Sequence, residues 1–282
     1  MATISKARLA RRLSLDKAVK VTSVALAVIA MAMLGWILLT LISRGLGAMN
    51  MAVFTNDAFG RPPGLLHSIV GSSIQIMIAT LIATPIGVLA GTFLAERPKG
   101  SKLAETIRFV NDILLSAPSI LIGLFVYALI VIPTGTFSGW AGAAALSMIV
   151  LPVVVRATED MLRLVPTQLR EAAFALGASH WTVVSNVLWT AARAGILTGV
   201  LLAIARAAGE TAPLLFTAFG NPQLRTSLDA PMSTLPVQIF NLTLSADPAD
   251  IALAWAGALI ITVGVLILNI TSRFIIGFAG RK

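Results

Sequence analysis

The chain has 282 residues, of which 57% are hydrophobic and only 12% charged, and its formal net charge is +9. Because a soluble domain has about 25% charged residues, this composition excludes an ordinary soluble protein and indicates a protein of the lipid bilayer. The chain has no cysteine, which excludes thiol catalysis, thiolate metal sites and disulfides.

Long apolar runs predict an all-α membrane protein, because about 20 apolar residues in a helix cross a bilayer core about 30 Å thick. The runs are Val21–Ile42, Ser68–Ala95, Ile113–Val155, Ala191–Phe219 and Ile251–Ile276. The third run is too long for one helix, and the turn-forming sequence PTGTFSG at Pro133–Gly139 divides it in two. The second run carries a Pro-Ile-Gly sequence at Pro85–Gly87, which predicts a break. These runs predict six transmembrane helices, with both termini on one side of the membrane.

The apolar runs also suggest how the chain is organised. We assign residues 1–20 to a basic tail, 21–43 to the first transmembrane helix, 66–274 to one membrane core domain and 275–282 to a C-terminal end. The first apolar run is about twice as long as that of a signal peptide, so we expect a retained anchor helix. No hydrophilic stretch is long enough to form a separate soluble domain.

Lysine and arginine are concentrated on one side of the predicted bundle, which sets its orientation. The basic side carries Lys6, Arg8, Arg11, Arg12, Lys17, Lys20, Arg97, Lys99, Lys102, Arg108, Arg156, Arg163, Arg170, Arg193, Arg273, Arg281 and Lys282. The opposite side carries only Arg44, Arg61 and Arg225. We therefore predict a multi-pass protein of a bacterial plasma membrane with both termini in the cytoplasm. Because the basic residues lie in short loops between apolar runs, they indicate contact with a membrane surface and not with nucleic acid.

The cytoplasmic segment 166–190 has a helix-forming sequence between two apolar runs. Pro166 is typical of a helix start and Gly177 of a helix end. One face of this helix carries four apolar residues at helical spacing: Leu169, Ala172, Ala173 and Leu176. A short amphipathic helix, a glycine bend and a second helix entering the membrane are predicted. The small alanines permit close approach by a partner, with Arg170 and Glu171 making charged contacts at its rim, but a helix lying on lipid fits this pattern equally well.

Arg206 and Glu210 interrupt the fifth apolar run. A charge at the centre of a membrane helix costs roughly 2.5–3.5 kcal/mol, so such residues usually face a pore or a partner. The two residues are four positions apart and can pair on one helix face, and Arg206 is expected about 20 Å along the helix from Ala191. Such a pair can lock the helix against its neighbours. Alternatively, Arg206 offers an anion a fixed charge and planar donors, Glu210 compensates that charge in the empty path, and Thr211 adds a hydroxyl donor.

Several catalytic patterns are absent from the sequence. There is no GxxxxGK[ST] loop for ATP phosphates, no HExxH and no Ser-His-Asp pattern, so the chain is not expected to be an enzyme or to hold a cofactor. His67 and His180 have no carboxylate at ligand spacing, so no metal site is predicted. Glu159 and Asp160 are expected to be solvated charges of a cytoplasmic loop.

Four residues of the cytoplasmic segment match the EAA loop of ABC-importer permeases, in which three residues separate EAA from a glycine: Glu171, Ala172, Ala173 and Gly177. Val187 stands at the aliphatic position that follows in this motif. Trp189 and Thr190 replace the Leu and Pro that end the family pattern, which leaves the entry angle of the fifth helix open, because proline would have fixed the backbone there.

Further stretches resemble the PstA family of phosphate-specific permeases, which belongs to the MetI-like permeases. They are SAPSILIGLFVYALIV (Ser116–Val131), LPVVVRATEDMLRLVP (Leu151–Pro166), ARAAGETAPLLFTAF (Ala205–Phe219) and TLPVQIF (Thr234–Phe240). The resemblance covers the chain from about Leu66 to Phe274. It implies the type I ABC importer permease fold and a role in the import of inorganic phosphate.

The resemblance also implies partners and site residues. The partners are an ABC ATPase subunit like PstB, which docks on the EAA loop and binds ATP and Mg²⁺, a second permease like PstC, and a phosphate-binding protein like PstS. Arg156 becomes a candidate for lining the exit of the anion, together with Arg206, Glu210 and Thr211. The alternatives are a permease of the same fold for another oxyanion, such as sulfate or phosphonate, and a stand-alone secondary transporter or structural membrane protein.

Overall fold

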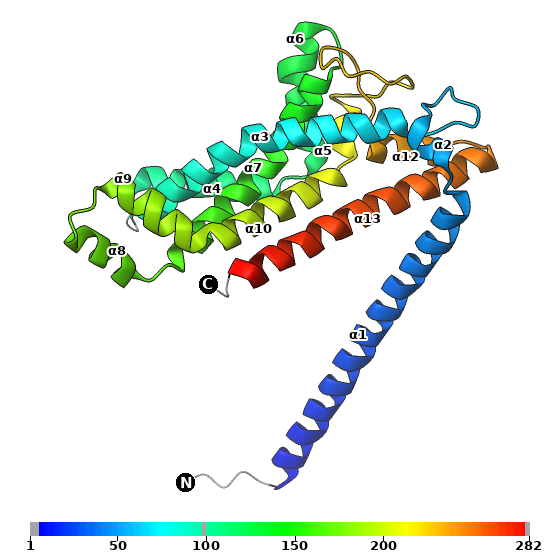
Figure 1. The fold of residues 1–282 in the computed structure, drawn as a ribbon. Helices are drawn as coiled ribbons and strands as arrows, with labels where there is room; N and C mark the ends of the chain where they lie inside the picture. Colours follow the sequence, from blue (N-terminus) through cyan, green and yellow to red (C-terminus); the bar gives the residue numbers. More distant parts are fainter. Residues whose placement is uncertain (1–5, 98–99, 280–282) are drawn as a thin grey trace.

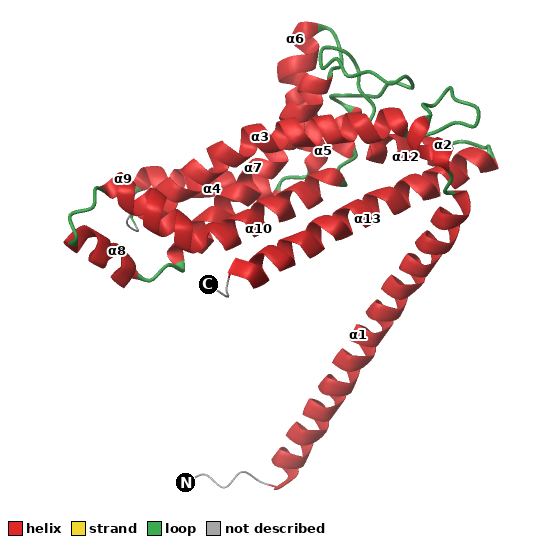
Figure 2. Ribbon diagram, viewed as in Figure 1, coloured by secondary structure: helices red, strands yellow, loops and turns green. Residues whose placement is uncertain are grey.

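The computed structural model describes residues 6–97 and 100–279, which form helices and loops without a strand (Figure 2). The elements are α1 (Lys6–Ala48), α2 (Met51–Thr55), α3 (Leu66–Glu96), α4 (Lys102–Ser116), α5 (Ser119–Val126), the π-helical η1 (Tyr127–Val131), α6 (Ile132–Thr134), α7 (Gly139–Arg163), α8 (Thr167–Ala175), α9 (His180–Thr182), the π-helical η2 (Val183–Leu188), α10 (Trp189–Ala208), α11 (Ala212–Leu215), α12 (Leu235–Thr243) and α13 (Pro248–Ala279). The prediction of an all-α membrane protein is confirmed. Of the residues used to predict the orientation, Lys99, Arg281 and Lys282 lie outside the described residues, as do residues 1–5 of the basic tail.

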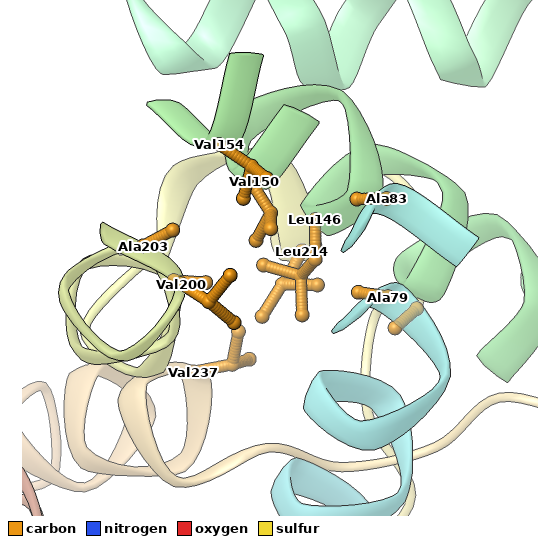
Figure 3. Close-up of a cluster of buried hydrophobic side chains, with 11 residues drawn as sticks. Ala79, Ala83, Leu146, Val150, Val154, Val200, Ala203, Leu214 and Val237 are labelled. Carbon is orange, nitrogen blue, oxygen red and sulfur yellow. The ribbon is translucent and has the colours of Figure 1, made fainter. Parts of the chain in front are cut away.

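Helices α3, α7 and α10 pack side by side around the main hydrophobic core (Figures 1 and 3). The buried members of this core are Ala79, Ala83, Leu146, Val150, Val154, Val200, Ala203, Ala207, Leu214, Ala218 and Val237. Most of them are alanine or valine, and such small side chains let membrane helices approach one another closely and gain van der Waals contact. This core fixes the relative positions of α7 and α10, which carry the candidate site residues Arg156 and Arg206.

Glycines on α3 bring its backbone close to α7. A Cβ atom added at Gly87 would lie 2.8 Å from Val154 Cβ, and one added at Gly91 would lie 2.6 Å from both Thr158 Cβ and the Val155 carbonyl oxygen. Real Cβ atoms do not come so near to other heavy atoms. The two helices therefore depend on glycine at these positions.

We expect Gly91→Ala to lower the stability of the protein by about 1–3 kcal/mol, because the new methyl group would press on a backbone carbonyl that cannot move alone. Gly264→Ala on α13 is the control: a Cβ there would meet nothing within 4 Å, and alanine is favoured over glycine in a helix by roughly 0.5–1 kcal/mol. The thermal midpoint of the purified transporter measures both. A midpoint for Gly91→Ala as high as that for Gly264→Ala would contradict the close packing of α3 on α7.

Within residues 6–97 and 100–279, five helices are long and apolar enough to cross a membrane, and a sixth crossing requires that Lys102–Ser116 and Ser119–Thr134 form one bent span. The chain bends by 106° between these two segments. The predicted third span is therefore not a single straight helix. The physical reason is Pro118, which lacks the N–H that would continue α4 and holds the preceding Ala117 in an extended conformation.

Two predicted interruptions have opposite outcomes. The turn at Pro133–Gly139 is confirmed, because Gly135 has φ +71° and α7 starts at Gly139. The predicted break at Pro85–Gly87 is wrong, because α3 continues through Pro85 to Glu96. Proline removes one helical hydrogen bond, but the residues on both sides of it are packed against α7 and hold the helix together.

The fifth predicted span, Ala191–Phe219, is displaced in the structure. The membrane helix starts at His180, passes through η2 and α10, and ends at Ala208. Gly209 follows as the C-terminal cap, and Pro213 lies in the first turn of the separate short helix α11. Arg206 thus lies in the last turn of a membrane helix and not in its interior.

Helix α1 lies apart from the bundle for most of its length (Figure 1). Its apolar part, Leu15–Ala48, is only 6% buried. It meets α13 near its C-terminal end, where Gly45 packs on Leu259 and the Arg44 guanidinium carbon lies 5.7 Å from the centroid of the Trp255 ring. So large an apolar surface is covered by lipid or by protein in a membrane. The helix is continuous across residues 20 and 21, where the sequence suggests a boundary between tail and first span.

Candidate functional site

Helix α8 projects from the end of the bundle at which α3 and α7 also end (Figure 1). None of its nine residues is buried. Glu171 and Ala172 are exposed, and Ala173 is half-buried against the end of the bundle. Leu169 is 46% exposed, and Leu176, directly after the helix, is 88% exposed. This segment thus presents apolar side chains that nothing in the described chain covers.

Arg170 of α8 points inward. Its Nη1 atom lies 2.6 Å from Glu96 Oε1 at the end of α3, and its Nη2 atom donates a hydrogen bond of 3.1 Å to the Leu162 carbonyl near the end of α7. The Arg170 and Glu96 side chains are only 21% and 17% exposed. The Arg170 guanidinium therefore binds groups of its own chain. The sequence suggests instead that Arg170 contacts a partner protein at the edge of the helix.

The return from α8 into the membrane has a defined geometry. Gly177 has φ +79°, which confirms the predicted glycine bend, and the Ser179 side chain caps the next helix by accepting from Thr182 N at 3.3 Å. The π-helical η2 then leads into α10 without a proline. Trp189, at the position where the family motif has leucine, donates from Nε1 to Thr92 Oγ1 of α3 at 3.0 Å. This contact sets the entry angle that the sequence leaves open.

Helix α10 ends beside the N-terminal third of α3, where Ala208 lines a groove together with Ser72 and Ile76. Ile76 lies about 20 positions before Glu96, so the end of α10 is about 30 Å from the C-terminal end of α3. Arg206 is exposed in the last turn of α10. A cation there also faces the negative end of the helix dipole.

Glu210 and Thr211 lie beyond the helix and are half-buried. The Glu210 backbone N–H bonds to the Ala207 carbonyl at 3.2 Å, and Thr211 is the residue that precedes α11. Among the ion pairs of residues 6–97 and 100–279, none joins Arg206 to Glu210. The predicted pair on one helix face is therefore wrong, because the helix ends at Ala208 before Glu210 can lie one turn above Arg206.

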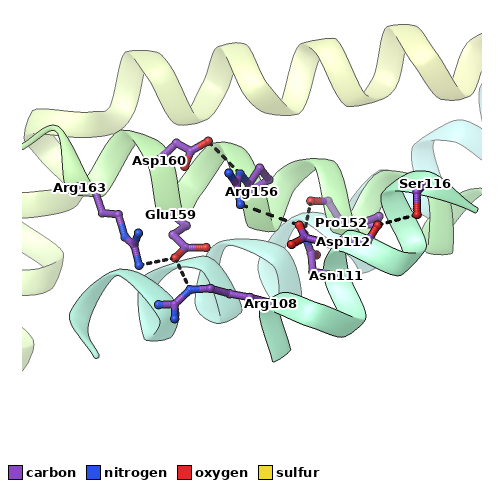
Figure 4. A network of polar contacts seen from close by, with 9 residues as sticks. All are labelled: Arg108, Asn111, Asp112, Ser116, Pro152, Arg156, Glu159, Asp160 and Arg163. Atoms are coloured by element: carbon purple, nitrogen blue, oxygen red, sulfur yellow. Dashed lines mark hydrogen bonds and ion pairs between the residues drawn. The ribbon is translucent and has the colours of Figure 1, made fainter. Parts of the chain in front are cut away.

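A buried ionic cluster joins α4 to the C-terminal half of α7 (Figure 4). Glu159 is 2% exposed, and its Oε1 atom lies 2.8 Å from Arg108 Nε and 2.7 Å from Arg163 Nη2. Arg108 also donates to the Leu94 carbonyl at 2.8 Å. The prediction that Glu159 is solvated is wrong, because two arginines compensate its charge and permit its burial.

Arg156 lies one turn nearer the membrane centre on α7 and remains half-exposed (Figure 4). Its Nε atom lies 3.2 Å from Asp160 Oδ2, and its Nη1 atom lies 3.9 Å from Asp112 Oδ1 of α4. All three side chains are at least 50% exposed, as expected for Asp160. Contacts of this kind in water are weak, so the Arg156 guanidinium can exchange its carboxylate partners for another anion.

No group of three or more histidine, aspartate or glutamate side chains in the described part of the chain is placed to hold a metal ion. His67 lies at the start of α3 and His180 at the start of α9. The site chemistry thus consists of arginines, carboxylates and hydroxyl groups along the bundle, and of an exposed apolar segment at one end.

Residues 83–277 match the family described as "Binding-protein-dependent transport system inner membrane component". The chain belongs to this family. The match starts within α3 and includes α7, α8, α10 and most of α13. The chain is thus the permease subunit of an ABC transporter and a multi-pass membrane protein, which implies an ATPase and a further permease as partners.

Two curated relatives show how far the similarity extends along the chain. Over 240 residues the chain is 52% identical to "Phosphate transport system permease protein PstA" of Pasteurella multocida, and the match covers 84% of this chain and 86% of the relative. Over 263 residues it is 34% identical to "Phosphate transport system permease protein PstA 1" of Mycobacterium tuberculosis, covering 90% of this chain and 86% of the relative. The resemblance to the PstA family is therefore confirmed over most of the chain.

Solved structures show the same fold. A chain of the MetNI methionine ABC transporter, in an inward-facing conformation, has a TM-score of 0.60 at 19% identity and covers 77% of this chain and 94% of its own length. A second crystal form gives 0.57 at 20% identity with the same coverage. The MetI-like permease fold is confirmed.

The sequence interpretation did not include Glu96 and Asp112, and it used Arg108 only to predict the orientation. Glu159 and Arg163 are four positions apart, so their pairing could have been predicted from helical spacing. Glu96 and Arg108 join partners more than 50 positions away. No local pattern reveals such contacts.

Proposed function

We propose that the chain is a permease subunit of an ATP-driven importer of inorganic phosphate and forms the translocation path with a second permease. The observation that carries this proposal is the identity of 52% to a phosphate transport permease over 84% of the chain. The exposed Arg206 supports it, because an arginine on the side of a membrane bundle faces a path or a partner and not lipid.

The anion path that we propose uses Arg206, Glu210, Thr211 and Arg156. A phosphate anion leaving water needs replacement donors, and the planar guanidinium of Arg206 supplies charge and two parallel hydrogen bonds. Glu210 lies four positions further on but makes no ion pair with Arg206, so the Arg206 guanidinium can bind phosphate directly and donate hydrogen bonds to it. The negative charge of Glu210 weakens retention of the anion, and the Thr211 hydroxyl is a further donor. At the inner end, Arg156 exchanges Asp112 and Asp160 for the departing phosphate.

We propose partners for the surfaces of the chain that are exposed in the structure. An ABC ATPase like PstB binds ATP and Mg²⁺ and docks on the exposed segment formed by α8, Leu176 and Gly177. A second permease like PstC completes the path, and a phosphate-binding protein like PstS delivers the anion to the outer mouth. Both termini lie in the cytoplasm of a bacterial cell, since the basic residues lie on the side of α8.

Uptake of labelled phosphate, sulfate and phosphonate by cells that lack this chain tests the proposal. We expect the absence of the chain to abolish high-affinity phosphate uptake alone, and the reintroduced chain to restore it. Loss of sulfate or phosphonate uptake with phosphate uptake intact would leave the fold assignment unchanged and would show that phosphate is not the substrate. Unchanged uptake of all three anions would overturn the proposed function.

A further inference from the structure

We propose that Glu96 is a positioning residue that transmits movement of α8 to α3, and through α3 to the loop Met232–Leu235 at the opposite end of the bundle. This inference rests on the proposed function, because it assumes that a partner ATPase moves α8. It assigns a role in coupling to a residue outside the EAA motif. Three features of the structure carry it: the few contacts of α8, the environment of Glu96, and the attachments of α3 at its outer end.

Helix α8 has few ways to transmit a force to the bundle. None of its residues is buried, and Leu164 in the connection before it is 73% exposed. A Cβ atom built at Gly177, in the connection after it, would meet nothing within 4 Å. Ala173 packs against the cluster that contains Val183 and Val184, and the Phe174 ring lies 6.2 Å from the His180 ring, so these contacts join α8 to α9 and η2. The Arg170 side chain contacts Glu96 at the end of α3. We therefore expect movement of α8 to reach α3 through Arg170.

Glu96 receives that contact at the end of α3. Its Oε1 atom lies 2.6 Å from Arg170 Nη1, and its Oε2 atom lies 3.9 Å from His180 Nε2. A carboxylate in the last turn of a helix is opposed by the helix dipole, so Glu96 does not stabilise its own helix. Both Glu96 and Arg170 are mostly withdrawn from water, where a charge-assisted hydrogen bond is stronger than at an exposed surface. Glu96 is thus placed to hold α8 to α3 through its contact with Arg170.

Helix α3 is suited to carry the displacement across the membrane. It is unbroken over 31 residues, which is about 46 Å at 1.5 Å per residue. Near its outer end the Ser68 hydroxyl lies 2.9 Å from the Ser233 hydroxyl, and Ser72 Oγ accepts from Leu235 N at 2.7 Å. Gln75 Nε2 also donates to the Met232 carbonyl at 3.4 Å. These buried bonds attach the outer loop to the helix whose inner end holds α8.

The test uses the complete importer in proteoliposomes and measures phosphate transported per ATP hydrolysed. We expect Glu96→Gln to lower this ratio by about fivefold or more, as for the loss of an allosteric coupling, while ATP hydrolysis continues. Glu105→Gln, an exposed acid on α4, is the matched control and should keep the wild-type ratio. A wild-type ratio in Glu96→Gln would overturn the inference.

A covalent replacement of the contact separates coupling from folding. The chain has no cysteine, so Glu96→Cys with Arg170→Cys introduces the only two thiols of this subunit. The importer is assembled with cysteine-free partners. We expect a low ratio with free thiols and a restored ratio after bridging with a short bis-methanethiosulfonate, which joins the two cysteines through disulfides. Reduction of these disulfides should lower the ratio again. A bridged protein that remains uncoupled would overturn the inference even if Glu96→Gln is defective. If wild-type importer moves no phosphate but moves another anion, the proposed substrate fails, and the same ratio for that anion still tests Glu96.

Discussion

Replacement of Arg206 by glutamine should reduce phosphate uptake by about tenfold or more, because a charge-assisted hydrogen bond to an anion contributes roughly 1.5–3 kcal/mol. Arg206 is exposed at the end of α10, beside the N-terminal third of α3, and has no ion-pair partner in residues 6–97 and 100–279. Replacing Arg206 therefore does not leave a buried carboxylate without its ion-pair partner. The loss should appear in transport while the amount of protein in the membrane stays normal. Initial rates of labelled phosphate uptake over a range of concentrations measure it.

Two further variants define what Arg206 supplies. Arg206→Lys keeps the charge but loses the planar pair of donors, so we expect an intermediate rate. Arg225→Gln removes an exposed arginine of the outer loop and should leave the rate unchanged. Equal rates for Arg206→Gln and Arg225→Gln would show that Arg206 does not contact the anion.

Replacement of Glu159 by alanine should lower the stability of the transporter by about 3 kcal/mol, the lower end of the cost of breaking a buried ion pair. Glu159 is 2% exposed and holds Arg108 of α4 and Arg163 of α7 at 2.8 and 2.7 Å. Without it, two arginines lose their carboxylate, and α4 loses an ionic attachment to α7. We expect the lower end of this range of stability loss because the side chains of Arg108 and Arg163 are partly exposed to water. Thermal unfolding of the purified transporter and its abundance in the membrane measure the effect.

Asp160 provides the matched control for Glu159, because it is the next residue on the same helix. Its side chain is 50% exposed and pairs with the half-exposed Arg156 at 3.2 Å, so Asp160→Ala should cost less than about 1 kcal/mol. Similar losses of stability for the two variants would contradict the burial of the Glu159 cluster.

The apolar runs predict the order of the membrane segments, because burial in lipid demands long apolar helices wherever they occur in the chain. Six are predicted, and the described residues contain five, or six if the bent pair Lys102–Ser116 and Ser119–Thr134 is one span. The apolar runs fail at the ends of helices. The run from Gly195 to Phe219 has no charged residue except Arg206 and Glu210, yet the helix ends at Ala208, where Gly209 caps it. Hydropathy cannot distinguish a membrane helix from a short apolar helix such as α11 that packs against the bundle.

In the candidate site, features that depend on neighbouring residues can be predicted from the sequence, and contacts between distant residues cannot. The helix α8, the bend at Gly177 and the position of Arg206 near a helix end depend on neighbouring residues in the sequence. The contact of Arg170 with Glu96 joins residues 74 positions apart. It depends on how α3 and α7 pack, and the sequence alone places Arg170 on a surface because an arginine in a polar segment is usually solvated.

Phosphate transport by the reconstituted importer tests the central claim most directly. Proteoliposomes would contain this chain with its ATPase and second permease, ATP on the side of α8, and the binding protein with equal concentrations of phosphate and sulfate on the other side. We expect ATP-dependent transport of phosphate with little sulfate, and the loss of phosphate transport in Arg206→Gln while ATP hydrolysis continues. Transport of sulfate in preference to phosphate, or full phosphate transport by Arg206→Gln, would contradict the central claim.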